Sequence, residues 1–514
     1  MKKVIVIFSF LIFTLAGCSD FLDVNENPNF PAEVEDYLIL PASQASVASV
    51  MSADYGLVGS FWSQHWTQNN TSSQYKTFET YTLGSNDGRV DGSYLEMYVG
   101  GLGDNEILHL KAEAEENWGL YLMTSTIKAY GFQYLVDFYG NVPYDEAFKG
   151  ESEGIFNPKI NSGEEVYNSI YELLNVALSK DLSDFNADRY ASADLLLGAN
   201  INDWVAFANT LKLRIILRQA YANSAWANTE LASLLASGTF LTTEVALRNF
   251  EDVDSKSNPL FEADQRQLNT SNNIRANATF TTYLKANGDP RLDVLFAEIA
   301  GNRYGMITGS YEVPNEVWLA PDFISKPILT ATMPVYLMTV AESELLQAEA
   351  YYRLGDLVNA KLHYDAGVSS SFDRMGVSAA GLLGTGEPYA FNEAHLGLDA
   401  TDTPDPLRDI IMAKWVDAAD GQRGMESFID RVRTGYPKAC SAAVQNEMVR
   451  GYEADLPANY IPGTLIYSIK GATGGKFPVR LPYADSEINY NSNAAAYKGL
   501  ADGDVMQTKV WWNK

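Results

Sequence analysis

The sequence predicts a mostly α fold, in which a tetratricopeptide-like helical-repeat scaffold carries a loop-rich ligand-binding region and a few short strands. Several segments place apolar residues at the spacing of a buried helix face. Residues 340–372 have the pattern of a helix pair, whereas residues 238–335 and 373–403 are rich in Gly, Asn, Asp and Pro. Because loops on a rigid scaffold usually carry binding residues, we expect these two insertions to lie at the ligand.

Residues 1–17 are predicted to be a lipoprotein signal peptide. Lys2 and Lys3 give it a positive start, residues 4–16 are apolar or small, and the run Leu15-Ala16-Gly17-Cys18 matches a lipoprotein cleavage box. Cleavage before Cys18 would free its amine, and its thiol would carry a diacylglycerol. The apolar run is shorter than the about 20 residues that span a bilayer, so we expect a lipid anchor alone. The alternative is an ordinary signal peptide with a chance cysteine.

The rest of the chain divides into a short tether and one α-helical body. Residues 18–33 have no helical period and contain two prolines, which predicts an extended tether. In the body, 34–514, helical spacing of apolar residues predicts helices over 34–51, 119–138, 163–182 and 203–222, and a charged, solvated helix within 95–117. Residues 452–483 are broken by Pro and Gly, with a short strand expected at 465–470.

Residues 340–372 contain the clearest repeat unit. The run 342–350 opens one helix, Leu354-Gly355-Asp356 breaks it, and Ala360, Tyr364 and Gly367 pack the second. A glycine at the turn, an alanine five residues later and an aromatic residue four after that form the pattern of a tetratricopeptide repeat. Since at least three units are needed for a continuous core, the other helix pairs are candidates for degenerate copies.

Composition limits the classes of partner. The formal net charge is −28, so phosphate backbones and anionic lipid heads repel the body, and nucleic acid is not expected as a partner. The 30 tyrosines and 9 tryptophans supply flat apolar faces with a polar group, which suit both interfaces and sugar rings. The acidity is compatible with neutral or basic ligands and does not identify one.

The known catalytic motifs are missing or incomplete. If Cys18 is acylated, Cys440 has no partner for a disulfide, and no histidine near it in sequence would activate its thiol. The run 471–476 is one residue short of a phosphate-binding loop, and Phe477 stands where a hydroxyl residue is required. The four histidines have no metal-site spacing, and the Gly-x-Ser-x-Gly pattern does not occur. The chain is therefore expected to bind its ligand and not to act as an enzyme.

Three segments combine aromatic side chains with amide groups, as a sugar or peptide site requires. Trp62 and Trp66 are four residues apart, so in a helix they would share one face, either a ligand platform or part of the core. The polar run 68–74 is expected to form an exposed loop. The candidate ligand-binding residues are Trp62, Trp66, Gln68, Asn69, Asn70, Tyr75, Asn269, Asn273, Arg275, Tyr304, Tyr311 and Trp318.

A series of motifs runs through the chain in a fixed order. They occupy residues 18–29, 137–147, 204–218, 289–292, 341–352, 480–490 and 509–512. Together they resemble the SusD/RagB family of surface nutrient-binding lipoproteins from Bacteroidetes, over essentially the whole chain. Their roles here are expected to be structural: Gly140 ends a helix, residues 289–291 form a turn with an Asp–Arg pair, and residues 486–489 tie the C-terminal segment to the core.

The resemblance implies a function. It implies a lipid-anchored protein that faces outward from the outer membrane, captures a nutrient, most simply a glycan or oligosaccharide, and delivers it as a lid to a TonB-dependent SusC-like barrel. No nucleotide or redox cofactor is expected, and a structural calcium ion is left open. The resemblance transfers no site residue. Three alternatives stay open: the same architecture with a peptide or another nutrient as ligand, a surface enzyme that cleaves glycans, and a scaffold that only organises other proteins.

Overall fold

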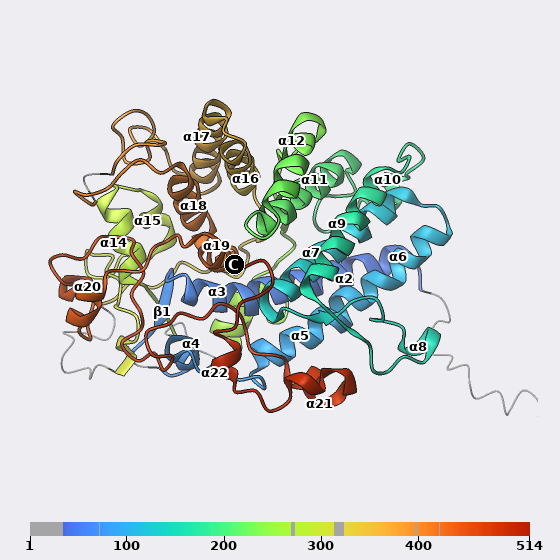
Figure 1. The fold of residues 1–514 in the computed structure, drawn as a ribbon, viewed down its shortest axis with the longest axis horizontal. Coiled ribbons are helices and arrows are strands. Elements are labelled where there is room, and N and C mark those ends of the chain that lie inside the picture. The colour runs from blue at the N-terminus through green and yellow to red at the C-terminus, as the bar shows by residue number, and fades with distance from the viewer. Residues whose placement is uncertain are drawn as a thin grey trace, which may run out of the picture.

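The computed structural model describes residues 34–70, 72–268, 273–312, 323–395, 398–420 and 422–513. Helices make up most of this part of the chain and strands are few and short, which confirms the predicted fold class (Figure 1). One apolar core cluster runs from Leu40 in the first helix to Trp512 near the last described residue. The predicted signal peptide, Cys18 and the tether lie outside the described residues.

The helices fall into a long set and a short set. The long helices are α2 (Asp36–Ser49), α6 (Asp104–Ala114), α7 (Trp118–Tyr139), α9 (Gly163–Leu178), α11 (Ile201–Gln219), α12 (Ser224–Ser237), α14 (Ala278–Ala286), α16 (Val340–Arg353), α17 (Leu357–Arg374), α18 (Pro406–Asp417) and α19 (Gly424–Thr434). The short helices are α3 (Gly56–Trp62), α4 (Lys76–Thr80), α5 (Ser93–Glu96), α8 (Gly150–Glu153), α10 (Ala187–Tyr190), α13 (Pro259–Phe261), α15 (Arg291–Leu295), α20 (Ala442–Glu447), α21 (Asp485–Tyr490) and α22 (Asp502–Val505). The π-helical segments are Val50–Tyr55, Gly88–Gly92, Met97–Gly103 and Glu262–Gln267.

The predicted helices over 119–138, 163–182 and 203–222 are confirmed as α7, α9 and α11. The helix expected over 34–51 is longer, because the π-helical segment Val50–Tyr55 carries α2 directly into α3. The charged helix expected within 95–117 ends at Ala114, and it starts upstream at Gly88 through α5 and two π-helical segments. Capping side chains explain two of the starts: Ser162 caps α9 in a capping box with Glu165, and Asn117 caps α7.

The helix pair predicted at 340–372 is confirmed as α16 and α17, which lie side by side in Figure 1. The Thr339 hydroxyl accepts a hydrogen bond from the Glu342 amide at 3.0 Å, and Asp356 caps α17. The two helices approach closely at Gly367, where an added Cβ would lie 2.7 Å from Cγ of Leu345. The small residue in the repeat pattern is therefore required by packing.

The strands form three antiparallel pairs. Strand β1 (Trp66–Gln68) pairs with β5 (Ile274–Ala276), β2 (Val142–Pro143) with β3 (Ile160–Asn161), and β4 (Val245–Leu247) with β6 (Val335–Met338). The strand expected at 465–470 is wrong: only Leu465 pairs, in an isolated bridge with Ala439. Pro462 and Gly463 precede this segment, and a turn follows it, in which the Gly471 amide donates to the Ser468 carbonyl. Too few extended residues remain between them to form a ladder.

A network of buried ion pairs joins α7, α11 and α19. Nε of Arg218 lies 3.0 Å from Asp137, and its Nη2 lies 2.9 Å from Glu426. Glu426 also faces Arg214, which reaches Glu342 of α16 at 3.1 Å. These side chains are at most 3% exposed, so the pairs are desolvated and each charge depends on its partners.

The network continues through α16, α18 and the start of α19. Arg423 links Glu342 to Asp417 of α18, at 3.2 and 2.6 Å. Arg433 links Glu349 of α16 to Asp430, at 2.5 and 2.8 Å. Because each guanidinium bridges carboxylates on two different elements, the network fixes the relative positions of the helices as well as neutralising their charge.

The family-like motifs have the structural roles expected of them. Gly140 ends α7 at a φ of 75°, and an added Cβ would lie 2.7 Å from Nη1 of Arg480. Asp289 and Arg291 form the expected buried pair at 2.6 Å. The Ser486 amide donates to Asp91 at 2.7 Å, which ties the C-terminal segment to the helical body.

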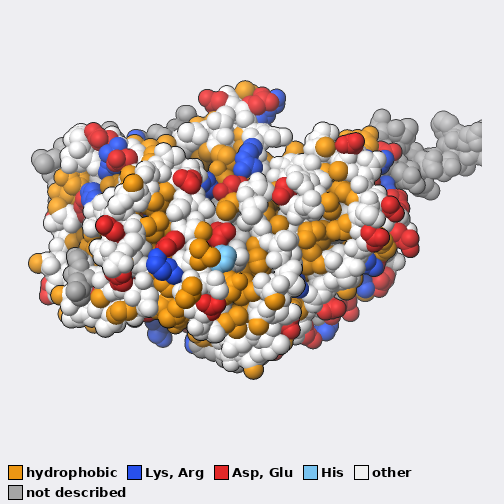
Figure 2. Space-filling model, turned by 90° about the horizontal axis from the view of Figure 1, so that it is seen from above, with side chains coloured by type: hydrophobic (Ala, Val, Ile, Leu, Met, Phe, Trp, Pro, Cys, Tyr) orange, Lys and Arg blue, Asp and Glu red, His pale blue; other side chains and the backbone are white. Residues whose placement is uncertain are grey.

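Acidic side chains gather at one end of the molecule. Figure 2 shows them along its right-hand edge, the end where α6 and α10 lie in Figure 1. Glu35, Glu115, Glu116, Asp181 and Asp184 line a shallow depression there. This end also holds Glu35 and Asp36, which are among the first described residues.

Removing one member of the buried network should destabilise the protein strongly. For Arg218→Leu we expect the free energy of unfolding to fall by about 3–5 kcal/mol, because Asp137 and Glu426 are left buried without their partner. Urea denaturation measures the change. The control is Lys361→Ala, which breaks an exposed pair with Asp365 and should cost less than about 1 kcal/mol. Equal effects of the two substitutions would contradict a stabilising role for the network.

The same network should make the fold sensitive to acid. Burial alone would raise the pKa of Glu426, but the guanidinium groups of Arg218 and Arg214 outweigh it and hold the pKa well below its usual range. Arg374 and Arg423 do the same to the pKa of Asp417. A depressed pKa gives stability that is present above the ordinary carboxyl value and is lost as pH falls. We therefore expect the urea midpoint to fall steeply between about pH 4.5 and pH 2; an unchanged midpoint over this range would contradict the assignment.

Candidate functional site

The strand pair β1–β5 brings several of the predicted binding residues together. Thr67 faces Arg275 and Gln68 faces Ile274 in the register, and the Asn69 amide donates to the Asn273 carbonyl at 2.9 Å. The Asn273 side chain donates to Asp264 at 3.1 Å. The Tyr75 hydroxyl donates to the same carboxylate oxygen at 2.6 Å. Residues that are about 200 positions apart in the sequence therefore share one hydrogen-bonded cluster.

Glu79, which the sequence did not single out, holds this cluster in place. Its carboxylate accepts hydrogen bonds from the Thr67 hydroxyl, from the Gln68 amide at 2.7 Å and from the Gly309 amide at 2.6 Å. Burial raises the pKa of Glu79 to about 7, although these hydrogen bonds act in the opposite direction. The side chain is 2% exposed, so it positions backbone and does not reach a ligand from solvent.

Trp62 and Trp66 do not share a helix face, because α3 ends at Trp62 and Trp66 begins β1. Their exposed fractions are 3% and 1%. The Trp62 indole donates to the Phe78 carbonyl at 3.2 Å, and its ring lies 5.0 Å from that of Phe428. Both rings are packed in the core, which is the alternative that the sequence left open; whether they contact a ligand stays a prediction.

The exposed loop expected over 68–74 is wrong at its start. Gln68 and Asn69 are buried, because the Gln68 side chain accepts from the Tyr75 amide at 2.5 Å and donates to Ser72 at 2.6 Å. Asn70 is partly exposed and residues 73 and 74 are exposed, so only the later part of the run reaches solvent.

The remaining candidates occupy other positions. Tyr304 is partly exposed, with its ring 5.0 Å from Phe323 and 5.3 Å from Tyr452. Tyr311 is 4% exposed, and Nζ of Lys76 lies 5.3 Å from its ring. Arg275 is buried in β5. Asn269 and Trp318 lie outside the described residues, so their contribution to the site stays a prediction.

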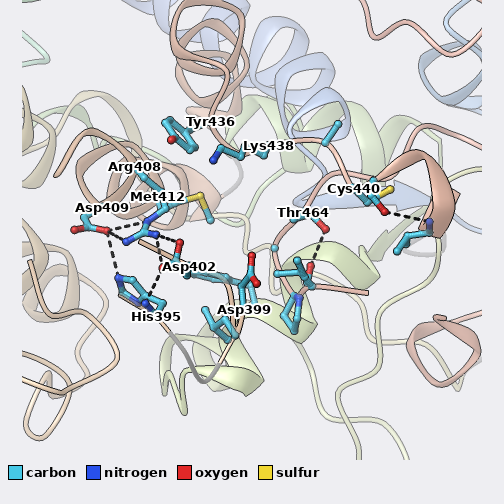
Figure 3. A pocket seen from close by; sticks show the side chains of 18 of the residues that line it. His395, Asp399, Asp402, Arg408, Asp409, Met412, Tyr436, Lys438, Cys440 and Thr464 are labelled. Atoms are coloured by element: carbon cyan, nitrogen blue, oxygen red, sulfur yellow. Dashed lines mark hydrogen bonds and ion pairs between the residues drawn. The ribbon is translucent and has the colours of Figure 1, made fainter. Parts of the chain in front are cut away.

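A pocket of about 310 Å³ lies away from this cluster, where α14, α17 and α18 meet the segment 436–464 (Figure 3). Its residues come from stretches that are far apart in the sequence: Tyr283 lies in the expected insertion 238–335, and residues 389–402 lie in the expected insertion 373–403. Figure 3 shows Arg408, Asp409 and His395 at one end of the pocket and Cys440 and Thr464 at the other.

The charged end of the pocket is internally neutralised. Arg408 forms hydrogen bonds with both Asp402 and Asp409, with Nη2 of Arg408 2.8 Å from the latter, and it also donates to the Glu393 carbonyl at 3.0 Å. Nε2 of His395 lies 3.3 Å from Asp409. Burial would lower the pKa of Arg408, but Asp409 and Asp402 outweigh this effect and raise it, so the guanidinium stays charged and paired.

The opposite side of the pocket carries Lys438 and Cys440. Nζ of Lys438 lies 5.1 Å from the Tyr436 ring. Figure 3 shows Lys438 across the cavity from Asp399. Burial raises the pKa of the Cys440 thiol to about 11, so this cysteine is a thiol near neutral pH and lacks the thiolate of a catalytic nucleophile.

Buried tyrosines form the apolar wall of the pocket. Tyr283 and Tyr364 are 6% and 1% exposed, and within the part of the chain that the structure describes neither hydroxyl has a hydrogen-bond partner. The neighbouring Tyr389 differs, because its hydroxyl donates to Asp289 at 2.5 Å. With ring faces and uncommitted polar groups together, the pocket suits a small ligand that has apolar faces and hydroxyl groups.

In the described ranges, no group of three or more His, Cys, Asp or Glu side chains is placed to hold a metal ion. No helix of the described chain combines the length and apolar character needed to cross a membrane.

Comparison with known proteins identifies relatives of the whole body. A SusD-like family model, described as starch-binding and associating with the outer membrane, matches residues 28–452. A SusD homolog from Bacteroides uniformis has 22% identity and a TM-score of 0.66, covering 93% of this chain and 99% of its own. A chitin-binding SusD homolog from Flavobacterium johnsoniae has 20% identity and a TM-score of 0.67, covering 93% and 97%. A SusD/RagB family protein from Bacteroides thetaiotaomicron has 20% identity and a TM-score of 0.68, covering 94% and 99%. Comparison with curated protein sequences gave no match.

The buried position of Trp62 predicts a stability effect. For Trp62→Ala we expect the free energy of unfolding to fall by about 3–5 kcal/mol, because the substitution leaves a cavity beside Phe428. Chemical denaturation measures the change, and Val358→Ala, at a position 80% exposed, is the control with an effect within about 0.5 kcal/mol. Unchanged stability together with lost ligand binding would instead show that the Trp62 ring is a binding platform.

Proposed function

Because this chain belongs to the SusD-like family of starch-binding proteins that associate with the outer membrane, we propose that it captures a glycan or oligosaccharide at the cell surface and delivers it, as a lid, to a TonB-dependent SusC-like barrel. The observation that carries the proposal is the family match over residues 28–452, which covers most of the helical body. The likeness to the solved structures supports the same fold over more than nine-tenths of the chain.

The proposal includes binding without turnover. The pocket and the β1–β5 cluster offer ring faces, amides and hydroxyls, and the one thiol in the pocket is held in its unreactive form. A relative described as chitin-binding supports chitin oligosaccharides as test ligands beside the starch fragments that the family description suggests. Among the candidate residues, Asn70 and Tyr304 are proposed ligand contacts because they are partly exposed, and Asn269 and Trp318 are proposed with them.

The proposal also includes attachment through lipid on Cys18. The described chain starts at the acidic end of the body, and a lipid on Cys18 would hold this end within about 50–60 Å of the membrane, the reach of 16 extended residues. Direct contact of the acidic surface with anionic lipid is disfavoured by charge, so the tether is the expected link. Replacement of Cys18 by serine should move the protein from the membrane fraction to the soluble fraction.

The function predicts saturable glycan binding with no product. We expect isothermal titration calorimetry to detect binding of maltoheptaose or chitohexaose, and chromatography after prolonged incubation to recover the oligosaccharide unchanged. Pull-down of the lipidated protein from outer membranes should recover a TonB-dependent barrel. Heat only with peptides would replace the glycan by a peptide ligand, release of shorter sugars would indicate an enzyme, and absence of the barrel would contradict delivery.

A further inference from the structure

The pocket between α14, α17 and α18 contains polar groups that the protein itself leaves uncommitted. Tyr283 and Tyr364 are more than nine-tenths buried, yet neither hydroxyl bonds to another described residue. Both hydroxyl oxygens reach the cavity that these side chains line, so a water molecule or a bound ligand can pair with them there. A bound molecule that both donates and accepts hydrogen bonds would satisfy them.

From this arrangement we propose that the pocket is a binding site for a compact, neutral sugar unit of one or two rings, either free or at the end of a chain. The proposal rests on the proposed function for the chemical class of the ligand and adds a site separate from the β1–β5 cluster. None of the candidate binding residues from the sequence lines this pocket.

The size of the pocket supports a short ligand. Its volume of about 310 Å³ lies at the lower end of the range for small-molecule sites. Tyr283, Tyr364 and Tyr389 are buried and close one side, so an extended chain cannot lie across them. An end unit fits where an internal stretch of a polysaccharide does not.

The wall chemistry supports a sugar. The tyrosine rings, Met412 and Pro462 present apolar surface to the C–H face of a sugar ring, while the two free hydroxyls can both donate to and accept from sugar hydroxyls. Asn459 at the exposed rim adds an amide with the same dual capacity. This combination of flat apolar faces and paired donors and acceptors is what a polyhydroxylated ring requires.

The charge of the pocket supports a neutral ligand. Arg408 is bound by Asp402 and Asp409, so it has little attraction left for an anion. Lys438 and Asp399 face each other across the cavity and oppose one another's field (Figure 3). Carboxylates outnumber free cations in the pocket, which disfavours an anionic sugar. A cationic ligand is disfavoured by the positive charge of Lys438.

Hydroxyl-deletion variants test the site without disturbing the fold. For Tyr283→Phe and Tyr364→Phe we expect unchanged melting temperatures, because no protein hydrogen bond is lost, and about three- to tenfold weaker binding of maltose or N,N′-diacetylchitobiose in calorimetry. Tyr490→Phe, at a position 83% exposed and outside the pocket, is the matched control and should bind normally. Ala439→Trp, at an exposed position of the lining, should block the entrance and abolish binding.

Protection of Cys440 gives an independent readout. The thiol lines the pocket and is half-buried, so a bound disaccharide should slow its alkylation at least threefold, as followed by peptide mass spectrometry at pH 9. One outcome overturns the pocket assignment and leaves the proposed function standing. In it, the pocket variants bind long oligosaccharides and disaccharides as well as the wild-type protein does, and no sugar protects Cys440. If disaccharides protect Cys440 but no barrel is recovered, the pocket assignment is supported and delivery fails. If no sugar binds, both are overturned.

Discussion

The fold depends on a continuous network of buried charge where α7, α11, α16, α18 and α19 meet. Six basic and six acidic side chains alternate through it: Arg214, Arg218, Arg374, Lys414, Arg423 and Arg433 with Asp137, Glu342, Glu349, Asp417, Glu426 and Asp430. A charge placed in such a core is tolerated only when its partner is in place. A shift of one helix relative to another would leave buried charges unpaired, which is unfavourable. Hydrophobic packing supplies most of the stability, whereas the network selects one arrangement of the helices.

Helix α18 connects this network to the pocket. Lys414 and Asp417, near its C-terminal end, belong to the network, whereas Arg408 and Met412, nearer its start, line the pocket. The position of the pocket wall is therefore fixed by the same contacts that fix the helical frame. A wall fixed in this way need not be ordered when a ligand binds, which reduces the cost of binding. Loop segments such as 459–464 complete the pocket and can differ in sequence without loss of the frame.

The sequence could predict the frame because its signals are local. Apolar spacing places α7, α9 and α11, and the spacing of Gly355, Ala360 and Tyr364 identifies the hairpin of α16 and α17. The sites depend instead on distant partners. Trp66 leaves the helix because it pairs with Ala276 of β5, and the Gln68 amide and Gly309 amide are joined by Glu79. The pocket residues Tyr283, Tyr364 and Lys438 come from separate segments, and the one that belongs to a motif, Tyr364, was identified by its packing role in the helix pair. No local pattern marks a hydroxyl as lacking a partner, because that depends on every residue around it.

The two proposed binding surfaces differ in how they are built. The β1–β5 cluster is built from hydrogen bonds between strands and loops, and its buried members, Gln68 and Asn273, hold the backbone from which the partly exposed Asn70 continues. The pocket combines helical residues, among them Tyr283 on α14 and Tyr364 on α17, with the loop segments 389–402, 436–441 and 459–464. A surface based on loops can adapt to the length and branching of a nutrient, whereas helix-borne hydroxyls stay in place and select for the shape of one unit. A receptor of this kind would hold a long ligand loosely along its length and specifically at its end. Because the second contact forms within the complex that the first has made, the two contacts together give a higher affinity than either alone.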